Sequence, residues 1–364
     1  MNPPRRILAL SGGGVRGIVE VAFLEAIEAE YSRRNGPGRI YDWFDLIGGT
    51  STGALIATAL ALGKPLEEIR DFYLDRAVTF FSRRRWFGLP VGPIFDSTAL
   101  EAEIRRDVGT IALDDPAFRT RLAIVSKRLD TGSSWIVSNI PTAPFWNHGA
   151  GDRWVGNRHY DVARLLRAAS AAPTLFSPQE IDIVEGAAAG VFIDGGISTY
   201  NDPALALLRL ARLKAFGLEW PLGPDRLFIL SLGTGRFRRR LSPAQLRNAP
   251  ALVTALRALT GMISDAEQAS LTMMEWLGTS PAPSRIDSEI GTLDGEFLAG
   301  VPLFTYLRLD LPLEAPDLAA AGLGRSPADL RLLRSLDRPE AIRPLYDLTR
   351  EWAARSLKLA DWLR

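Results

Sequence analysis

The sequence predicts an α/β fold, a three-layer sandwich in which helices flank a central and mainly parallel β-sheet. Short apolar segments alternate with helical patterns over the first two thirds of the chain, as in a parallel sheet covered on both faces. Hydrophobic residues make up 47% of the 364 residues, enough for a large core without disulfides or a structural metal. Two glycine-rich segments, residues 11–17 and 48–53, each follow a predicted strand and precede a predicted helix.

Apolar runs predict the strands of this sheet at residues 7–10, 44–47, 122–125, 135–137, 191–193, 227–232 and 305–309. The helix after the first strand has apolar residues four positions apart, on a stripe that we expect to face the sheet: Val15, Val19, Phe23 and Ile27. We expect one large domain over residues 1–310, followed by a C-terminal helical extension over residues 311–364.

Two helical segments lie outside the alternating pattern. The stretch 243–278 is a helical insertion and a candidate cap, and it holds three of the four methionines, Met262, Met273 and Met274. Flexible thioethers can wall a lipid pocket, but core packing is the favoured interpretation. The C-terminal segment has an apolar face that we expect to dock onto the body rather than onto a partner or a membrane: Leu345, Leu348, Trp352, Leu359 and Leu363.

Composition excludes several classes of function. With 43 basic and 42 acidic residues, the net charge of +1 gives no whole-chain signal for a nucleic acid polymer or an anionic membrane. The absence of cysteine excludes a thiol nucleophile, a cysteine-ligated zinc site and a disulfide framework. We expect no cofactor and no metal site. The oligomeric state does not follow from the sequence.

A cytoplasmic location is expected. The N-terminal apolar run, residues 7–10, is too short for the core of a secretory signal, and the most apolar stretch, 46–62, is interrupted by glycines. Residues 80–90 interleave aromatic and basic side chains, a composition that suits the lipid headgroup boundary. Peripheral contact with the inner face of the membrane is therefore a hypothesis, against a core-packed aromatic cluster with a solvated arginine rim.

The first glycine-rich segment predicts a site for negative charge. Glycines bring backbone N–H groups close to a ligand, and the helix start that follows favours an anion, either a phosphate or a transient oxyanion. The residues concerned are Gly12, Gly13, Gly14, Arg16 and Gly17. Because their spacing also matches a dinucleotide fingerprint, a nucleotide-binding module without esterase activity is the alternative. That alternative expects an acidic residue at the end of the second strand, where this chain has glycines and Ser51.

The second glycine-rich segment has the pattern of a nucleophile elbow, Gly49-x-Ser51-x-Gly53, between a predicted strand and an apolar helix. Small flanking residues are needed because the turn is strained and the strand and helix pass close together. We therefore expect Ser51 to be a catalytic nucleophile. A structural glycine turn is the alternative.

A serine nucleophile needs a base within hydrogen-bond reach. The chain has only His148 and His159, both in a polar stretch, so a histidine-containing triad is disfavoured. The better candidate is Asp194, at the end of a predicted buried strand and followed by Gly195 and Gly196, which allow a sharp turn. Partial desolvation would raise the proton affinity of this carboxylate toward that of a general base.

These three elements, in this order, resemble the patatin-like phospholipase family, whose pattern is a glycine-rich oxyanion loop, Gly-x-Ser-x-Gly and Asp-Gly-Gly. Residues 169–176, 201–203 and 231–235 are similar to the family as well. Family members more often have Asn-Asn-Pro where this chain has Asn201-Asp202-Pro203, a departure outside the dyad. The resemblance covers residues 6–310.

The resemblance implies a serine acyl hydrolase that cleaves fatty-acyl esters of lipids, with membrane phospholipid as the expected substrate. It implies a dyad without histidine, in which Ser51 is the nucleophile, Asp194 accepts the proton and backbone amides of residues 12–14 form the oxyanion hole. Arg16 either steadies this loop, meets a lipid phosphate or is solvated at the helix start. Some bacterial members are activated by a cyclic nucleotide and degrade membrane phospholipid in antiphage defence, and residues 127–133 are similar to that group. An ungated cellular lipase is favoured over an enzyme that a cyclic nucleotide activates.

Overall fold

The computed structural model describes residues 3–77, 81, 93–148, 151, 153–238, 247 and 249–357. Some expectations concern residues outside these ranges. They are the membrane-contact segment 80–90 apart from Phe81, much of the first part of the insertion 243–278, and Leu359 and Leu363 of the C-terminal apolar face.

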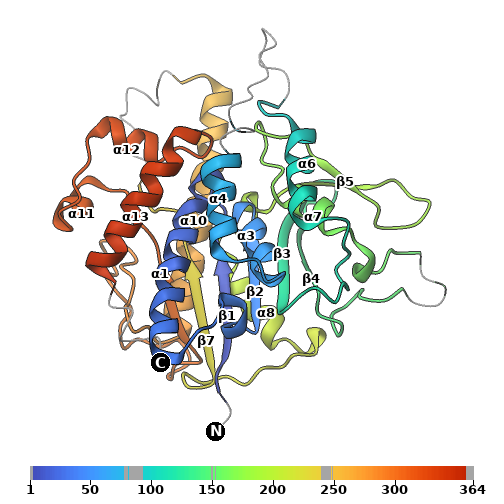
Figure 1. Ribbon diagram of the computed structural model, residues 1–364, viewed down its shortest axis with the longest axis horizontal. Coiled ribbons are helices and arrows are strands. Elements are labelled where there is room, and N and C mark those ends of the chain that lie inside the picture. The colour runs from blue at the N-terminus through green and yellow to red at the C-terminus, as the bar shows by residue number, and fades with distance from the viewer. Residues whose placement is uncertain are drawn as a thin grey trace.

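The described residues form one eight-stranded sheet with helices on both faces (Figure 1). Hydrogen-bonded neighbours connect the strands in the path β5-β6-β3-β2-β1-β7-β8, in which β6 and β2 pair with successive parts of β3, and β4 also pairs with β3. Strands β8, β7, β1, β2 and β3 run parallel, whereas β4 and β6 run antiparallel to β3. The predicted fold class is confirmed. The strands are β1 (Arg5–Leu10), β2 (Leu46–Thr50), β3 (Arg121–Arg128), β4 (Ser134–Ser138), β5 (Gln179–Ile181), β6 (Gly190–Asp194), β7 (Leu227–Leu232) and β8 (Thr305–Leu309).

All seven predicted strands are present, five of them with shifted ends and β7 and β8 with the predicted ends. The second was predicted to start at residue 44, which is wrong, because the short helix α2 (Ile40–Trp43) precedes it and β2 begins only at Leu46. The sequence prediction missed β5, a three-residue strand of which only Ile181 is buried. Such a short edge strand has no apolar pattern to detect.

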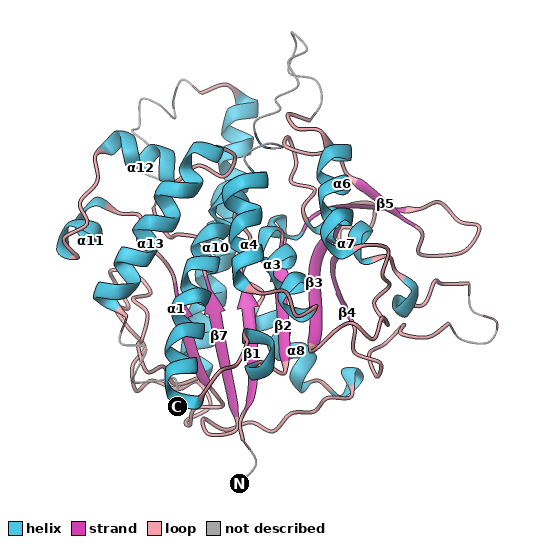
Figure 2. Ribbon diagram, in the orientation of Figure 1, coloured by secondary structure: helices cyan, strands magenta, loops and turns pink. Residues whose placement is uncertain are grey.

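Alternate residues of the strands face two separate cores, because successive side chains of a strand point to opposite faces of the sheet. In β1, Leu8 and Leu10 belong to one core, and Ile7 and Ala9 to the other. Figure 2 shows the helices on both sides of the sheet. The second core contains residues of α8 (Ala204–Arg212) and α10 (Ala251–Leu277). The first contains residues of α1 (Ile18–Asn35), α2, α3 (Thr52–Ala61), α4 (Leu66–Asp71), α6 (Ser97–Val108), α7 (Val162–Ala169), α11 (Ala315–Ala320), α12 (Pro327–Leu333) and α13 (Ile342–Ser356).

Six shorter helical turns connect these elements: η1 (Gly14–Gly17), η2 (Phe72–Ala77), η3 (Asn157–His159), η4 (Gly195–Ile197), η5 (Lys214–Phe216) and η6 (Pro339–Ala341). Two of them, η1 and η4, carry the glycines of the predicted site. The turn η1 follows the carboxyl end of β1, and η4 follows β6, whose last residue lies beside the carboxyl end of β2. Both therefore lie at the carboxyl ends of parallel strands, where α/β sheets bind their ligands.

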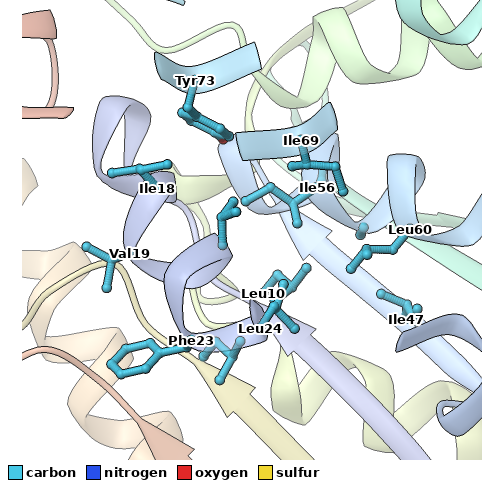
Figure 3. Packing of buried hydrophobic residues seen from close by; sticks show 14 of the residues in the cluster. Leu10, Ile18, Val19, Phe23, Leu24, Ile47, Ile56, Leu60, Ile69 and Tyr73 are labelled. Atoms are coloured by element: carbon cyan, nitrogen blue, oxygen red, sulfur yellow. The ribbon is translucent and has the colours of Figure 1, made fainter. Parts of the chain in front are cut away.

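Helix α1 is buried on several sides (Figure 3). All four residues of its predicted apolar stripe are fully buried, as expected. Helix α13 covers it from outside, where the ring of Trp352 meets that of Phe23 edge-on at 5.9 Å. Because Leu345 and Leu348 lie in the same core, docking of the C-terminal face is confirmed for its described residues. The division at residue 310 stays a prediction.

Truncation of the α1 core is expected to destabilise the fold. Leu24 is fully buried between the sheet and its covering helices, so Leu24→Ala should lower the free energy of unfolding by about 2–5 kcal/mol. Leu129, which is 53% exposed, is the matched control, and Leu129→Ala should change the free energy of unfolding by less than about 0.5 kcal/mol. Chemical denaturation of both variants measures the difference. Equal losses would contradict the described packing.

Candidate active site

Ser51 and Asp194 come together because β2 and β6 meet end to end along one edge of β3. Strand β4 occupies the other edge, over residues 123–127. On the shared edge, β2 pairs in parallel with residues 121–125 and β6 pairs antiparallel with residues 126–128. The carboxyl ends of the two strands therefore point at each other. Ser51 directly follows β2, and Asp194 is the last residue of β6.

Ser51 occupies a strained turn between β2 and α3. Its backbone has φ 54° and ψ −123°, a region that costs a non-glycine residue on the order of 1–3 kcal/mol. A side-chain carbon at Gly49 would lie 2.1 Å from the carbonyl oxygen of Gly53, and one at Gly53 would lie 2.3 Å from that of Leu10. The structure thus has the close crossing that the elbow pattern predicts, and it presents Ser51 at the amino end of α3.

The hydroxyl of Ser51 donates a 2.6 Å hydrogen bond to Oδ2 of Asp194. The other carboxylate oxygen of Asp194 accepts the N–H of Gly196 at 2.7 Å. Asp194 is 5% exposed, and this burial raises the pKa of its carboxyl to about 6, because desolvation outweighs the two hydrogen bonds, which lower it. A serine hydroxyl therefore contacts a carboxylate of raised proton affinity.

The Asp-Gly-Gly turn is glycine-dependent because other chain segments press against it. A side-chain carbon at Gly195 would lie 2.5 Å from the carbonyl oxygen of Val125. One at Gly196 would lie 2.7 Å from Oδ1 of Asn201. These contacts fix the direction in which the Asp194 side chain leaves β6.

The glycine loop passes directly beside Ser51. A side-chain carbon at Gly12 would lie 3.3 Å from Cβ of Ser51. The N–H of Gly12 already donates to the carbonyl of Asn201 at 3.1 Å, so it is engaged within the protein. Within the described residues, no acceptor is assigned to the N–H groups of Gly13 and Gly14. Of the three amides predicted to bind an oxyanion, these two are therefore available.

The backbone of the loop is fixed by its neighbours. Gly14 has φ +59°, and a side-chain carbon there would lie 2.2 Å from the carbonyl oxygen of Leu336. A side-chain carbon at Gly17 would lie 2.3 Å from Oγ1 of Thr52. Arg16 is half-buried rather than solvated. Its guanidinium donates to the carbonyl of Gly235 at 3.2 Å and lies over the Phe237 ring, which supports a role in steadying the loop.

Sequence reasoning missed a buried arginine behind the loop. Arg308 donates to Oγ of Ser11 at 2.9 Å and to Oγ of Ser231 at 2.7 Å, and it forms ion pairs with Asp202 at 3.1 Å and Asp310 at 3.0 Å. Burial alone would lower the pKa of this guanidinium, but the two carboxylates raise it above its ordinary value. An arginine inside the otherwise apolar strand β8 was the available signal.

Ser51, Asp194 and the glycine loop line a cleft of about 1710 Å³. Its apolar lining residues include Phe81 and residues of α3, η2, α6 and the segment after α7: Leu55, Phe72, Leu100, Leu175 and Phe176. Its charged lining residues come largely from α10 and the loops around it: Arg236, Arg257, Asp265, Glu267, Arg285 and Asp287. The site thus has both an apolar and a mixed-charge lining.

Helix α10 lines the cleft, but not through its methionines. Met262 is 67% exposed on the outer surface, and Met273 is also exposed. Met274 is fully buried in the second core, as the favoured interpretation of core packing predicts. The cleft-facing residues of the helix include Ile263 and Leu271. The idea that methionines wall the pocket is therefore wrong.

Neither histidine approaches the dyad. His148 and His159 are both exposed and do not line the cleft, and Nδ1 of His148 is 2.7 Å from the carbonyl oxygen of Trp154. Among the residues with assigned positions, no cluster of three acidic, histidine or cysteine side chains is arranged to hold a metal ion. In the same part of the chain, no helix is long and apolar enough to cross a membrane.

Comparison with known proteins identifies the family of this chain. The family model described as patatin-like phospholipase matches residues 8–208, more than half of the chain, and this span contains the glycine loop, the elbow and the Asp-Gly-Gly turn. The chain belongs to the patatin-like phospholipase family.

The similarity to individual relatives covers part of this chain and part of each relative. A cGAMP-activated phospholipase of Escherichia coli is 29% identical over 67% of this chain and 66% of that protein. Patatin group M-3 of Solanum tuberosum is 30% identical over 63% of this chain and 60% of that protein. The chain therefore matches slightly less than two thirds of these relatives. Human GIVD cytosolic phospholipase A2 superposes with a TM-score of 0.44 at 12% identity, over 99% of this chain and 59% of that structure.

The raised pKa of Asp194 predicts a pH-dependent stability. Its folded-state pKa of about 6 lies above the value of 3.8 expected for an ordinary aspartate, so the folded protein binds more protons between these values. The contribution of Asp194 to stability is therefore greatest below pH 3.8 and is lost as pH rises through about 6. Relative to Asp194→Asn, the wild type should lose about 3 kcal/mol of unfolding free energy over this range. Denaturant titrations of both proteins across this pH range measure the loss. A difference in unfolding free energy that stays constant with pH would contradict the raised pKa of Asp194.

Proposed function

We propose that this chain is a serine acyl hydrolase that cleaves fatty-acyl ester bonds of phospholipids, with Ser51 as nucleophile and Asp194 as base. The observation that carries the proposal is the 2.6 Å hydrogen bond between the Ser51 hydroxyl and the buried carboxylate of Asp194. A pKa of about 6 leaves Asp194 ionised at neutral pH, yet makes it a stronger base than an ordinary aspartate. No histidine is needed for this step.

The proposed reaction has two halves. Asp194 Oδ2 takes the hydroxyl proton of Ser51 while Oγ attacks the ester carbonyl, and the resulting oxyanion faces the free amides of Gly13 and Gly14. When the tetrahedral intermediate collapses, the bond to the alcohol oxygen breaks and Asp194 returns the proton to the leaving alcohol. A water molecule, deprotonated by Asp194, then attacks the acyl-serine, and the fatty acid leaves as Ser51 regains its proton.

The apolar lining of the cleft supports a lipid as the substrate. Phe81 and Phe176, which line the cleft, pack with the buried Phe95 at ring-centroid distances of 5.4–6.3 Å, and Leu55 and Leu100 line the cleft as well. A volume of about 1710 Å³ exceeds the roughly 300–1,000 Å³ typical of small-molecule sites. We propose that an acyl chain lies along these apolar residues and that the charged residues face the headgroup, with residues 243–278 acting as a cap.

The proposal extends to an activator and a cellular role. The relatives from Escherichia coli and Vibrio cholerae are named cGAMP-activated phospholipases. Residues 127–133 of this chain are similar to that bacterial group. We propose that a cyclic nucleotide raises the activity and that the enzyme then degrades membrane phospholipid in antiphage defence, through peripheral contact with the inner face of the membrane.

Loss of either dyad residue should abolish ester cleavage. Ser51→Ala removes the nucleophile and Asp194→Ala removes the base, so kcat on a fluorogenic phospholipid should fall by about 10³-fold or more in each. His148→Ala and His159→Ala are the controls and should stay within about two-fold. Activity that survives both dyad changes would refute the assignment, and activity lost with either histidine would favour a triad. Circular dichroism confirms folding.

The activator hypothesis predicts faster fatty-acid release in the presence of cGAMP. Mass spectrometry of a total lipid extract incubated with the enzyme, with and without cGAMP, should show more free fatty acid and lysolipid when the nucleotide is added. Ser51→Ala with cGAMP is the control. Equal release in both samples would identify an ungated lipase. Nucleotide-dependent melting shifts without any ester cleavage would instead favour the nucleotide-binding alternative.

A further inference from the structure

Asn201 joins the two halves of the proposed catalytic centre. Its carbonyl accepts the N–H of Gly12 at 3.1 Å, and its side-chain Nδ2 donates to the carbonyl of Gly12 at 3.4 Å. The same Nδ2 donates to Oε1 of Glu267 at 2.5 Å. Both partners of Nδ2 are acceptors, which fixes the orientation of the amide group. Asn201 therefore holds the Gly12 peptide unit from two directions.

The other atom of this amide faces the two catalytic turns. A side-chain carbon at Gly12 would lie 2.3 Å from Oδ1 of Asn201, and one at Gly196 would lie 2.7 Å from it. Gly12 belongs to the glycine loop, and Gly196 donates its N–H to Asp194. The Asn201 amide is thus packed between the loop that faces the oxyanion and the turn that orients the base.

Glu267 fixes this amide from a different layer of the fold. It lies on α10, whose Met274 is anchored in the second core, on the opposite side of the sheet from α1. A hydrogen bond to an ionised carboxylate is stronger than one between neutral groups. Burial raises the pKa of the Glu267 carboxyl, and the negative charge of Asp310 adds to this rise. The positive charges of Arg308 on β8 and Arg16 on η1 lower the pKa, as does the hydrogen bond from Asn201.

We propose that Glu267 is a positioning residue that acts through Asn201 to hold the glycine loop in place beside Ser51. The proposal rests on the proposed hydrolase function and adds a determinant of its rate. Without Glu267, the Asn201 amide loses its fixed partner and the Gly12 peptide can shift relative to Ser51. A displacement of about 1 Å of a catalytic group costs up to roughly 10²-fold in rate. Because Glu267 sits on a cleft-lining helix, a shift of α10 would be transmitted to the loop.

Kinetics separate this role from substrate contact and from simple helix stability. Glu267→Ala should lower kcat on a fluorogenic phospholipid by roughly 10- to 100-fold with KM changed by less than about three-fold. Glu267→Gln keeps an acceptor for Asn201 and should recover most of kcat. In an Asn201→Ala background, Glu267→Ala should have little further effect, because the two residues act in series.

Glu275→Ala is the matched control, since Glu275 is a buried acid on the same helix that instead accepts the N–H of Ser284 at 3.0 Å. It should leave kcat within about three-fold. Comparable loss in Glu275→Ala, or a rise in KM alone in Glu267→Ala, would overturn the proposal.

Hydrogen–deuterium exchange tests the same link without any catalysis. Amides of residues 11–17 should exchange faster in Glu267→Ala than in the wild type or in Glu275→Ala. Unchanged exchange together with unchanged kcat would overturn the proposal. Faster exchange in a protein whose wild type cleaves no ester would uphold the positioning role while refuting the hydrolase function, so the two failures are distinguishable.

Discussion

The hydrogen bond between Ser51 and Asp194 depends on one feature of sheet topology, the meeting of β2 and β6 on a single edge of β3. Val125 pairs with the last residue of β2 and Ser126 with the last residue of β6, so the strand ends are adjacent in register. A parallel β6 would carry its carboxyl end away from Ser51. The antiparallel direction of this one strand therefore allows a two-residue centre, because each side chain leaves its strand toward the other.

This arrangement carries a cost in stability that the surrounding core offsets. Ser51 has a strained backbone, and Asp194 is a carboxylic acid that is almost fully buried. Strain and desolvation of this kind persist only where packing leaves the chain no alternative. Here the constraint is visible as backbone and side-chain atoms pressed against Gly49, Gly53, Gly195 and Gly196. The two cores supply the stability, and the glycines let the strained centre fit between them.

The sequence was most informative where chemistry depends on neighbouring residues. The elbow and the Asp-Gly-Gly turn were predictable because a strand, small residues and a polar side chain follow one another along the chain. Contacts between distant segments were not predictable in this way. Arg308 reaches Ser11 across 297 positions, and Glu267 reaches Asn201 across 66, and neither contact leaves a local pattern. The missed β5 and the shifted start of β2 have other causes. β5 is a three-residue strand with only Ile181 buried, whereas β2 is buried throughout and its start was misplaced because the buried Phe44 follows α2 just before it.

The charges behind the glycine loop accommodate the buried carboxylate of Asp202. Asp202 and Asp310 both pair with Arg308, so each carboxylate has a cationic partner. Arg308 in turn binds Ser11 and Ser231, and Glu20 accepts the N–H of Ser11 at 2.6 Å. Burial raises the pKa of Glu20 well above its ordinary value, which favours its neutral form beside these carboxylates. Polar bonds thus hold the rear of the loop, whereas among the described residues no acceptor is assigned to the amides of Gly13 and Gly14. The proposed oxyanion hole would use these two amides, already held in position by the loop.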